Sequence, residues 1–397
     1  MLALLRRVPV QRYTRGAPRH AALSALASPS PVRQQAELED EYKDAGHDDA
    51  QSGVYRLPDA LHLEKGGVLE GVEVAYTTYG ELNAARDNAI VLCHALTGHS
   101  QVHQWWDAMV KPEWTDKYFL VCSNILGSCY GTTGPATINP ATQRPYGPSF
   151  PAVTLRDAIR VQKKLLQDGL GVQQVRSVVG GSLGGMQTLE WGFIGGPDYV
   201  KSVVPIACNS HHSAWQIAMS EVQRQAIYMD PNFQDGHYDP ATPPHQGLAL
   251  ARQIAMISYR THAAYRDKYG RDVVETQTPT KHPQYQVQSY LSYQGQKFLS
   301  RFDVNSFVAL THMMDMHDVG RGRGGVAQAL STVSQPALVV GVETDVLYPL
   351  AEQLELAEQL PHAAFHSIAS PHGHDGFLLE QDALAALTTE FLAKHGL

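Results

Sequence analysis

The stretch that most constrains the fold of this chain is SVVGGSLGGMQTLEW, residues 177–191. A β-branched run leads directly into four glycines grouped around Ser182, and a helix-like run follows. Gly180, Ser182 and Gly184 fit the pattern G-x-S-x-G, in which a serine occupies a tight strand-to-helix turn with its Oγ exposed above a sheet. The flanking residues must be small because the turn packs the helix closely against neighbouring strands. A plain glycine turn without a chemical role is the alternative interpretation.

The segments around this turn alternate between strand-like and helix-like patterns. Short apolar runs such as NAIVLC, KYFLVC and VKSVVPIA end in polar or glycine-bearing turns. Between two of them, residues 154–171 have helical period, with Thr154 and Asp157 as a possible capping box. This alternation predicts an α/β fold with a mainly parallel sheet covered by helices.

A different pattern covers residues 209–330, which form long segments of helical period rich in aromatic residues and methionine. We therefore expect a helical insertion over 209–330 that divides one α/β core into two parts, 46–208 and 331–397. We interpret the insertion as a lid and as a homodimer interface, because its helices are apolar and Met-rich. A role as lid core alone is the alternative.

The first 45 residues differ in composition from the rest. The first 36 contain six arginines, no lysine and no acidic residue, and the first acid is Glu37. An Arg-rich, Ser- and Ala-bearing, acid-free leader is typical of a mitochondrial transit peptide. We therefore predict a mitochondrial protein with a leader over 1–45. A tail without a targeting role, on a cytoplasmic protein, is the alternative.

Composition argues against several classes of protein. The net charge is −8 and the body has no Lys/Arg-rich block, so we expect no nucleic-acid partner. No apolar run approaches about 18 residues, so we expect no membrane span. The histidines show no zinc-binding spacing and the four cysteines form no CxxC pair, so we expect no metal and reduced thiols. GRGRGG at 320–325 matches G-x-G-x-x-G, but it follows a helical segment instead of a strand, which argues against a dinucleotide site.

A serine hydroxyl is a poor nucleophile without a base, so partners for Ser182 should follow later in the chain. On this pattern an acid comes next and a histidine last. Asp345 directly follows the apolar run ALVVGVE, and His374 lies in the polar loop SPHGHDGFL before the closing helix. His374 would accept the serine proton, and Asp345 would orient the imidazole. His372 competes for the role of base, and residue patterns alone leave both histidines open.

An oxyanion hole is also required by this chemistry. One donor should be the backbone N–H of Leu183, the residue after the serine, and the other should come from the loop after an early strand. CHALTGHS is such a loop, and we choose Leu96 within it.

Many blocks of the chain, in order, resemble one family. They include HALTG, NILGSCYGTTGPATINP, GGSLGGMQTLEW, EVQRQAIYMDPNF, SYLSYQGQKFLSRFDVNSF and SPHGHDGFL. From about residue 54 to the C-terminus the chain is similar to the homoserine O-acetyltransferases, a branch of the α/β-hydrolase fold. The resemblance implies acetyl-CoA as co-substrate, L-homoserine as acceptor, a ping-pong route through an acetyl-serine, and no permanently bound cofactor. The product would serve methionine biosynthesis, and the partners would be small molecules.

The resemblance also assigns roles to single residues. It implies Ser182 as nucleophile, Asp345 as acid and His374 as base, the last in preference to His372. It further implies substrate-binding roles, for the amino-acid carboxylate at Arg224, for the ammonium at Asp375, and for Tyr228 one turn beyond Arg224.

Some alternatives stay open at this stage. Leu183 stands where the family commonly has methionine, which leaves the backbone donor in place. Serine O-acetyltransferases and homoserine or serine O-succinyltransferases share nearly the same motifs, and one methylene in the acceptor changes discrimination by only about 1–3 kcal/mol. An esterase or thioesterase would use the same triad but has no need of Arg224 and Asp375 to hold a zwitterion. A non-catalytic binding protein would not need the three residues in this order.

Overall fold

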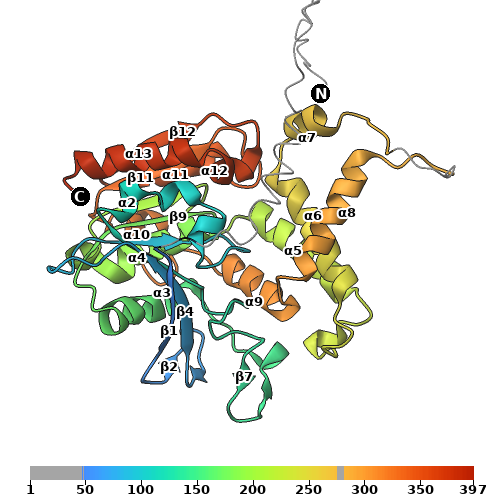
Figure 1. The fold of residues 1–397 in the computed structure, drawn as a ribbon, viewed down its shortest axis with the longest axis horizontal. Coiled ribbons are helices and arrows are strands. Elements are labelled where there is room, and N and C mark those ends of the chain that lie inside the picture. The colour runs from blue at the N-terminus through green and yellow to red at the C-terminus, as the bar shows by residue number, and fades with distance from the viewer. Residues whose placement is uncertain (1–46, 48, 275–280) are drawn as a thin grey trace, which may run out of the picture. The chain divides into compact units, whose positions relative to one another are not determined.

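A computed structural model describes residues 47, 49–274 and 281–397 of the chain. The leader predicted over 1–45 therefore lies outside the described residues. The centre of the structure is an eight-stranded sheet in the order β1-β4-β6-β5-β9-β10-β11-β12 (Figure 1). The strands from β6 to β12 are parallel, and β4 and β1 add two antiparallel strands at one edge. The prediction of a mainly parallel α/β sheet is confirmed.

The strands have the following bounds, in chain order: β1 Gln51–Arg56, β4 Glu73–Tyr79, β5 Ala89–Cys93, β6 Phe119–Ser123, β9 Val175–Gly181, β10 Val203–Ile206, β11 Ala337–Val342 and β12 Ala363–Ile368. Two short hairpins lie outside this sheet: β2 Leu61–His62 with β3 Val68–Leu69, and β7 Ile138–Asn139 with β8 Arg144–Pro145.

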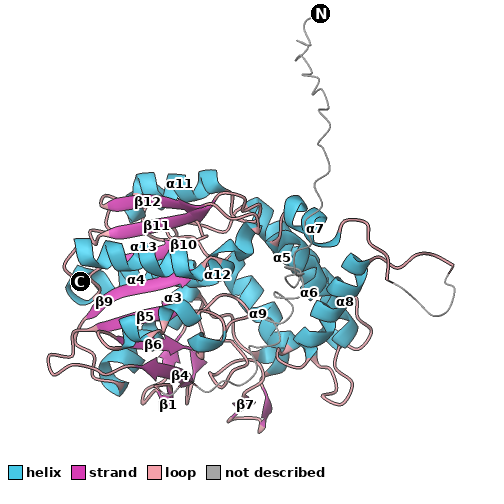
Figure 2. Ribbon diagram, turned by 45° about the horizontal axis from the view of Figure 1, so that its top comes forward, coloured by secondary structure: helices cyan, strands magenta, loops and turns pink. Residues whose placement is uncertain are grey.

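Helices cover both faces of the sheet (Figure 2). Strand β5 shows why, since all five of its residues are buried. Its Ile90 and Leu92 pack into one apolar cluster, while Val91 and Cys93 pack into another on the opposite face. A strand buried on both faces reads as a continuous apolar run, which is the pattern of NAIVLC. The helices of the core are α2 Pro112–Thr115, α3 Leu155–Lys164, α4 Leu183–Tyr199, α11 Leu350–Gln359, α12 Gly376–Leu379 and α13 Gln381–Lys394.

The start of α3 confirms the predicted capping box. Thr154 accepts a hydrogen bond from the backbone N–H of Asp157, and the Asp157 carboxylate accepts one from the backbone N–H of Thr154. Two backbone N–H groups at the N-terminus of the helix are thereby satisfied by side chains one turn apart. The helix then continues as a π-turn over Leu165–Gly169.

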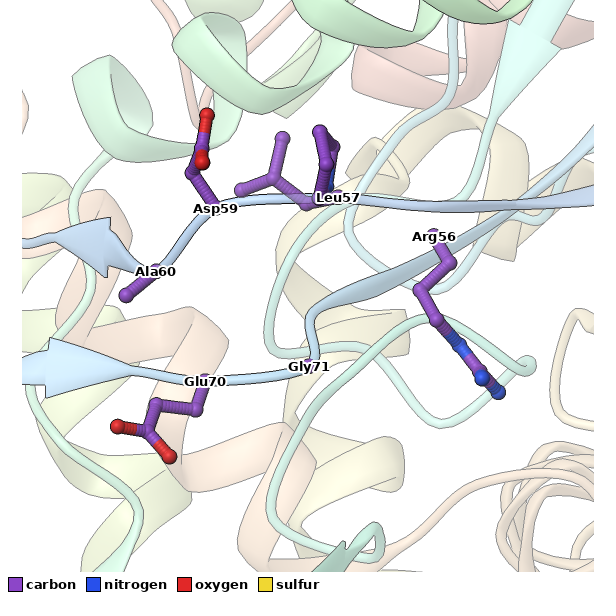
Figure 3. Close-up of a pocket in the computed structure, with 7 residues that line it drawn as sticks. Arg56, Leu57, Asp59, Ala60, Glu70 and Gly71 are labelled. Atoms are coloured by element: carbon purple, nitrogen blue, oxygen red, sulfur yellow. The ribbon is translucent and has the colours of Figure 1, made fainter.

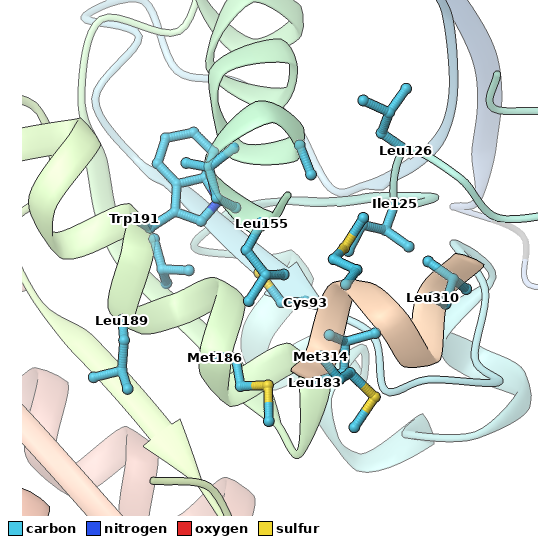
Figure 4. Packing of buried hydrophobic residues seen from close by; sticks show 14 of the residues in the cluster. Cys93, Ile125, Leu126, Leu155, Leu183, Met186, Leu189, Trp191, Leu310 and Met314 are labelled. Carbon is cyan, nitrogen blue, oxygen red and sulfur yellow. The ribbon is translucent and has the colours of Figure 1, made fainter. Parts of the chain in front are cut away.

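Between β10 and β11 the described residues form helices joined by loops and turns. The helices there are α5 Ala214–Tyr228, α6 His245–Tyr259, α7 His262–Tyr269, α8 Gln286–Leu299, α9 Val304–Asp315 and α10 Val326–Leu330. In both ribbon views α5, α6 and α8 lie side by side, away from the sheet. Helix α9 returns to the core, where its Leu310 and Met314 join the apolar cluster that holds Leu183 and Met186 of α4 (Figure 4). No helix in the described ranges is long and apolar enough to span a membrane.

Candidate active site

The turn between β9 and α4 holds Ser182 in an unusual backbone conformation. Its φ is +59° and its ψ is −123°, a combination that costs a non-glycine residue about 1–3 kcal/mol and therefore calls for a functional explanation. The turn is also very close to its neighbours. A Cβ added to Gly184 would lie 2.1 Å from the carbonyl oxygen of Cys93, and one added to Gly180 would lie 2.4 Å from the carbonyl oxygen of Gly184. The glycines are thus required by the close approach of α4 to β5.

A chain of hydrogen bonds connects Ser182 to two residues from distant parts of the sequence. His374 Nε2 lies 2.9 Å from Ser182 Oγ, and His374 Nδ1 lies 2.7 Å from Asp345 Oδ2. A carboxylate only accepts, so Nδ1 carries the proton and Nε2 accepts the serine hydroxyl. All three residues are buried. The hydroxyl is therefore aligned with a base that a carboxylate orients.

Asp345 is itself fixed by the turn that follows β11. Its Oδ1 accepts hydrogen bonds of 2.8 Å from the backbone N–H groups of Leu347 and Tyr348. These donors satisfy the oxygen that faces away from His374, so the buried carboxylate keeps partners on both sides. Its negative charge is thereby stabilised beside the imidazole.

His374 and His372 have different surroundings in the same loop. His374 belongs to a 3-10 turn, Gly373–Asp375, that follows β12. The backbone N–H of His372 donates to Ser370 Oγ, and within the described ranges its Nδ1 has no hydrogen-bond partner. The structure thus brings His374, and not His372, to Ser182.

Three aromatic rings surround the His374 imidazole, and the sequence analysis did not identify them. Tyr348 stacks on it with ring centroids 5.0 Å apart, Phe377 meets it edge-on at 5.4 Å, and Tyr259 lies at 5.8 Å. Tyr259 ends α6, so the helical insertion forms one wall of the site. Bulky rings on several sides restrict both the imidazole's rotation and its access to water.

The two backbone amides predicted for the oxyanion hole belong to Leu183 and Leu96. Leu183 is the first residue of α4, so its N–H has no acceptor within the helix. Leu96 is buried in the loop after β5, and among the described residues its N–H has no hydrogen-bond acceptor. Both remain predicted donors.

Arg224, on α5, is almost completely buried between two carboxylates. Its Nη2 lies 2.8 Å from Glu221 Oε2 and 2.7 Å from Asp315 Oδ2. Asp315 Oδ1 also lies 3.1 Å from Nδ1 of His212. The opposite nitrogen, Nη1, is buried and has no hydrogen-bond partner in the described part of the chain. One side of the guanidinium is thus anchored, while the other retains an unused donor.

The remaining two predicted substrate residues have protein partners. Asp375 Oδ2 lies 2.6 Å from Nε of Arg260, which directly follows α6 and was not identified from the sequence. Tyr228 donates or accepts a hydrogen bond of 3.3 Å with His312 on α9 and packs against Phe233. Both residues are therefore held by the helical insertion.

Two cavities are found whose lining residues do not include Ser182. One, of about 740 Å³, runs between the 135–153 segment and α9, and Tyr228, His312 and Asp315 are among its lining residues. The other, of about 510 Å³, is open and lies where the chain leaves β1 and enters β4, lined by residues such as Arg56 and Glu70 (Figure 3). In the described ranges no three His, Cys, Asp or Glu side chains are grouped to hold a metal ion.

Comparisons with known proteins identify first the class and then the family. A family model described as the alpha/beta hydrolase fold matches residues 88–381, so the chain is an α/β-hydrolase-fold protein. A homoserine O-acetyltransferase of Nostoc punctiforme is 49% identical over 342 residues, which cover 84% of this chain and 94% of the relative. One of Salinibacter ruber is 48% identical over 84% of this chain and 95% of the relative. The chain belongs to the homoserine O-acetyltransferase family.

Solved structures agree with this fold. A crystal structure of homoserine O-acetyltransferase from Bacillus anthracis has a TM-score of 0.79 and 25% identity, and the match covers 87% of this chain and 98% of that one. A crystal structure of an esterase also gives a TM-score of 0.79, at 24% identity. The backbone fold alone therefore does not separate transferase from esterase.

Proposed function

We propose that this chain transfers the acetyl group of acetyl-CoA to the side-chain hydroxyl of L-homoserine. The observation that carries the proposal is the hydrogen-bonded chain of Ser182, His374 and Asp345. It occurs in a protein nearly half identical to homoserine O-acetyltransferases over most of their length. The product, O-acetyl-L-homoserine, would serve methionine biosynthesis.

In the first half-reaction Ser182 Oγ attacks the thioester carbonyl. Its proton passes to His374 Nε2, and the oxyanion receives the N–H groups of Leu96 and Leu183. As the tetrahedral intermediate collapses, the carbon–sulfur bond breaks and the imidazolium returns the proton to the departing thiolate. The products are CoA thiol and an acetyl ester on Ser182.

In the second half-reaction the homoserine hydroxyl attacks that ester. His374 takes the hydroxyl proton and returns it to Ser182 Oγ, which leaves as the restored serine. Water would compete for the same ester, so transfer depends on holding the acceptor in place and excluding solvent. The aromatic residues around His374 support that exclusion, since Tyr259 brings a ring of the insertion to 5.8 Å from the imidazole.

Recognition of an amino acid by Arg224 supports a transferase rather than an esterase. The free Nη1 is a buried donor that lacks an acceptor, which is costly until an anion fills the position. A substrate carboxylate would supply it, with Asp315 holding the guanidinium in orientation. Asp375 would bind the substrate ammonium group, which would either displace Arg260 from the carboxylate or share the carboxylate with it. Tyr228 would complete this end of the site.

The proposal is tested by measuring CoA thiol release from acetyl-CoA without acceptor, with L-homoserine and with L-serine. Release that requires homoserine and disappears in Ser182→Ala is the expected result. Release that requires serine would reassign the acceptor, and release only from succinyl-CoA would reassign the acyl group. Equal release without any acceptor would show a thioesterase and refute the transferase.

Acceptor recognition has its own test. Arg224→Gln should raise the KM for homoserine by about tenfold or more, because a charge-assisted hydrogen bond contributes about 1.5–3 kcal/mol. The KM for acetyl-CoA should stay unchanged. A rise confined to acetyl-CoA would contradict the assignment.

We further propose that the protein is a homodimer joined through the insertion. Helices α5 and α6, and Met229 directly after α5, present large apolar side chains to solvent. Val222, Met229, Leu250 and Ile257 are 48–80% exposed. Such surfaces mark protein interaction sites. Sedimentation of the purified chain tests this, and a monomer at micromolar concentration would contradict it.

Mitochondrial import is a separate proposal that rests on the composition of residues 1–45 alone. The relatives compared above are bacterial proteins and give it no support. Fusing residues 1–45 to a fluorescent reporter in a eukaryotic cell would test it, with a reporter that stays in the cytoplasm as the contrary result.

A further inference from the structure

Two arginines of the helical insertion share one aromatic ring and have no carboxylate partner in the described ranges. Arg252, on α6, places its guanidinium carbon 5.1 Å from the Phe298 ring centre, and Arg301, just after α8, places its own 5.5 Å from the same centre. The arginine ion pairs found among the described residues all involve arginines other than these two. We call Arg252 and Arg301 the arginine pair.

Close packing of α6 on α8 creates this pair. A Cβ added to Gly295 of α8 would lie 2.8 Å from the carbonyl oxygen of Ala249 on α6. Arg252 and Phe298 each follow one turn after these contact positions. The glycine therefore brings the helices near enough for both guanidinium groups to reach one ring.

Within the described residues the arginine pair has an unsatisfied buried hydrogen-bond donor and no compensating negative charge. Arg252 Nε is buried and has no hydrogen-bond partner among the described residues. Burial, and next the positive charge of Arg252, lower the pKa of Arg301. Contacts with aromatic faces return only about 0.5–2 kcal/mol each, whereas an unsatisfied buried donor costs a similar amount and the two cations repel. An anion between them would supply the missing acceptor.

Neighbouring aromatic rings connect the arginine pair to His374 on one side and to the loop after β5 on the other. On one side Arg252 is 5.9 Å from the Tyr259 ring, and Tyr259 is 5.8 Å from the His374 ring. On the other side Phe302, next to Arg301, meets Tyr130 at 5.8 Å, and Tyr130 meets His99 of the loop after β5 at 5.2 Å. The Tyr130 hydroxyl is buried and also lacks a described partner.

The arginine pair reaches solvent through Arg301, which is exposed as a residue, whereas Arg252 is half-buried. A charged ligand can therefore approach the arginine pair from solvent at Arg301.

We propose that Arg252 and Arg301 bind phosphate groups of CoA when the acyl donor reaches Ser182. This rests on the proposed function. Among the proposed substrates, the homoserine carboxylate already has Arg224, and the acetyl group carries no charge. The phosphates are the remaining anions, and planar guanidinium groups match phosphate oxygens in bidentate geometry.

The test compares acetyl-CoA with acetyl-pantetheine, which lacks the nucleotide phosphates. Arg252→Gln and Arg301→Gln should each raise the KM for acetyl-CoA about tenfold or more, as expected for one lost charge-assisted contact. They should leave kcat/KM for acetyl-pantetheine and the KM for homoserine unchanged. Arg266→Gln is the matched control, because it removes one exposed positive charge from α7 and should alter neither donor.

Several results would overturn the assignment. An equal loss with both donors would show that the arginines only support the fold of the insertion. A raised KM for homoserine would assign them to the acceptor. Loss confined to succinyl-CoA would assign them to the distal carboxylate of a longer acyl group.

Direct binding separates this proposal from the proposed function. Calorimetric titration of the wild-type chain with CoA and with pantetheine needs no turnover. CoA should bind more tightly than pantetheine, and Arg301→Gln should remove the difference. Equal binding of the two ligands would refute the phosphate site even if acetyl transfer is observed, and Arg301→Lys provides a second variant that keeps the charge should the glutamine variant misfold.

Discussion

Acid should destabilise this protein through His94, which begins the loop that carries Leu96. His94 is fully buried. Its Nδ1–H donates to the Ala95 carbonyl at 2.8 Å, and its Nε2 accepts from the Ile125 backbone N–H at 3.1 Å. Both nitrogens are used by the neutral ring, so protonation would replace an acceptor by a donor facing an N–H. Burial lowers the pKa of His94 to about 4, from an ordinary value of 6.5.

The size of the effect follows from that shift. In the unfolded chain His94 takes up a proton as the pH falls through about 6.5, whereas in the folded chain it does so only near pH 4. The unfolded state therefore binds more protons between these values, and stability falls as the pH is lowered. Between pH 7 and pH 5 this single residue should reduce the free energy of unfolding by about 2 kcal/mol.

Urea unfolding at pH 7, 6 and 5 measures the effect, with His94→Gln as the comparison. Glutamine can donate and accept but does not titrate. Other histidines contribute to the wild-type slope, and the burial of His317 lowers its pKa to about 3. The difference between the two proteins isolates His94. Equal losses of stability in wild type and His94→Gln would refute the reasoning.

Three further predictions concern the turn and the ion pairs. Asp345→Asn should lower kcat by roughly 10³–10⁴-fold with little change in KM, measured by CoA release, because the imidazole loses its orienting carboxylate. Gly184→Ala should destabilise the fold by about 3 kcal/mol in thermal melts, since the new Cβ would meet the Cys93 carbonyl, and an unchanged melting temperature would contradict the close approach. Glu190→Gln should cost about 3 kcal/mol of stability, because buried Glu190 pairs with two arginines, and a loss below about 1 kcal/mol would show that solvent screens the pairs.

Local sequence patterns predicted those features of the fold and the site that depend only on residues close together in the chain. The turn around Ser182 follows from glycine spacing between a strand and a helix, and the capping box of α3 follows from two residues three positions apart. Such features depend on backbone geometry within one or two turns of chain.

The choice between His372 and His374 shows where local pattern stops. Both lie in one polar loop, two residues apart. The position is decided by Gly373, whose φ is +65°, and by the short 3-10 turn that directs the following side chain toward Ser182. Residue patterns alone left both histidines open, and family resemblance was needed to prefer one.

The ion pairs at the site could not be predicted because their partners are distant in sequence. Arg224 meets Asp315 on another helix, and Arg260 meets Asp375 in a loop of the core. The arginine pair around Phe298 likewise depends on how α6 and α8 pack. No periodicity encodes contacts of this kind, since they arise only when the insertion folds against the core.

The most direct test of the account is to trap the acyl-enzyme on Ser182. The chain is incubated with acetyl-CoA without acceptor, quenched in acid, and digested for mass spectrometry. The account predicts one added acetyl group on the peptide that contains Ser182, its absence in Ser182→Ala, and its disappearance after a brief chase with L-homoserine as O-acetyl-L-homoserine forms. An unmodified Ser182 peptide in an enzyme that still releases CoA with homoserine would contradict the covalent mechanism.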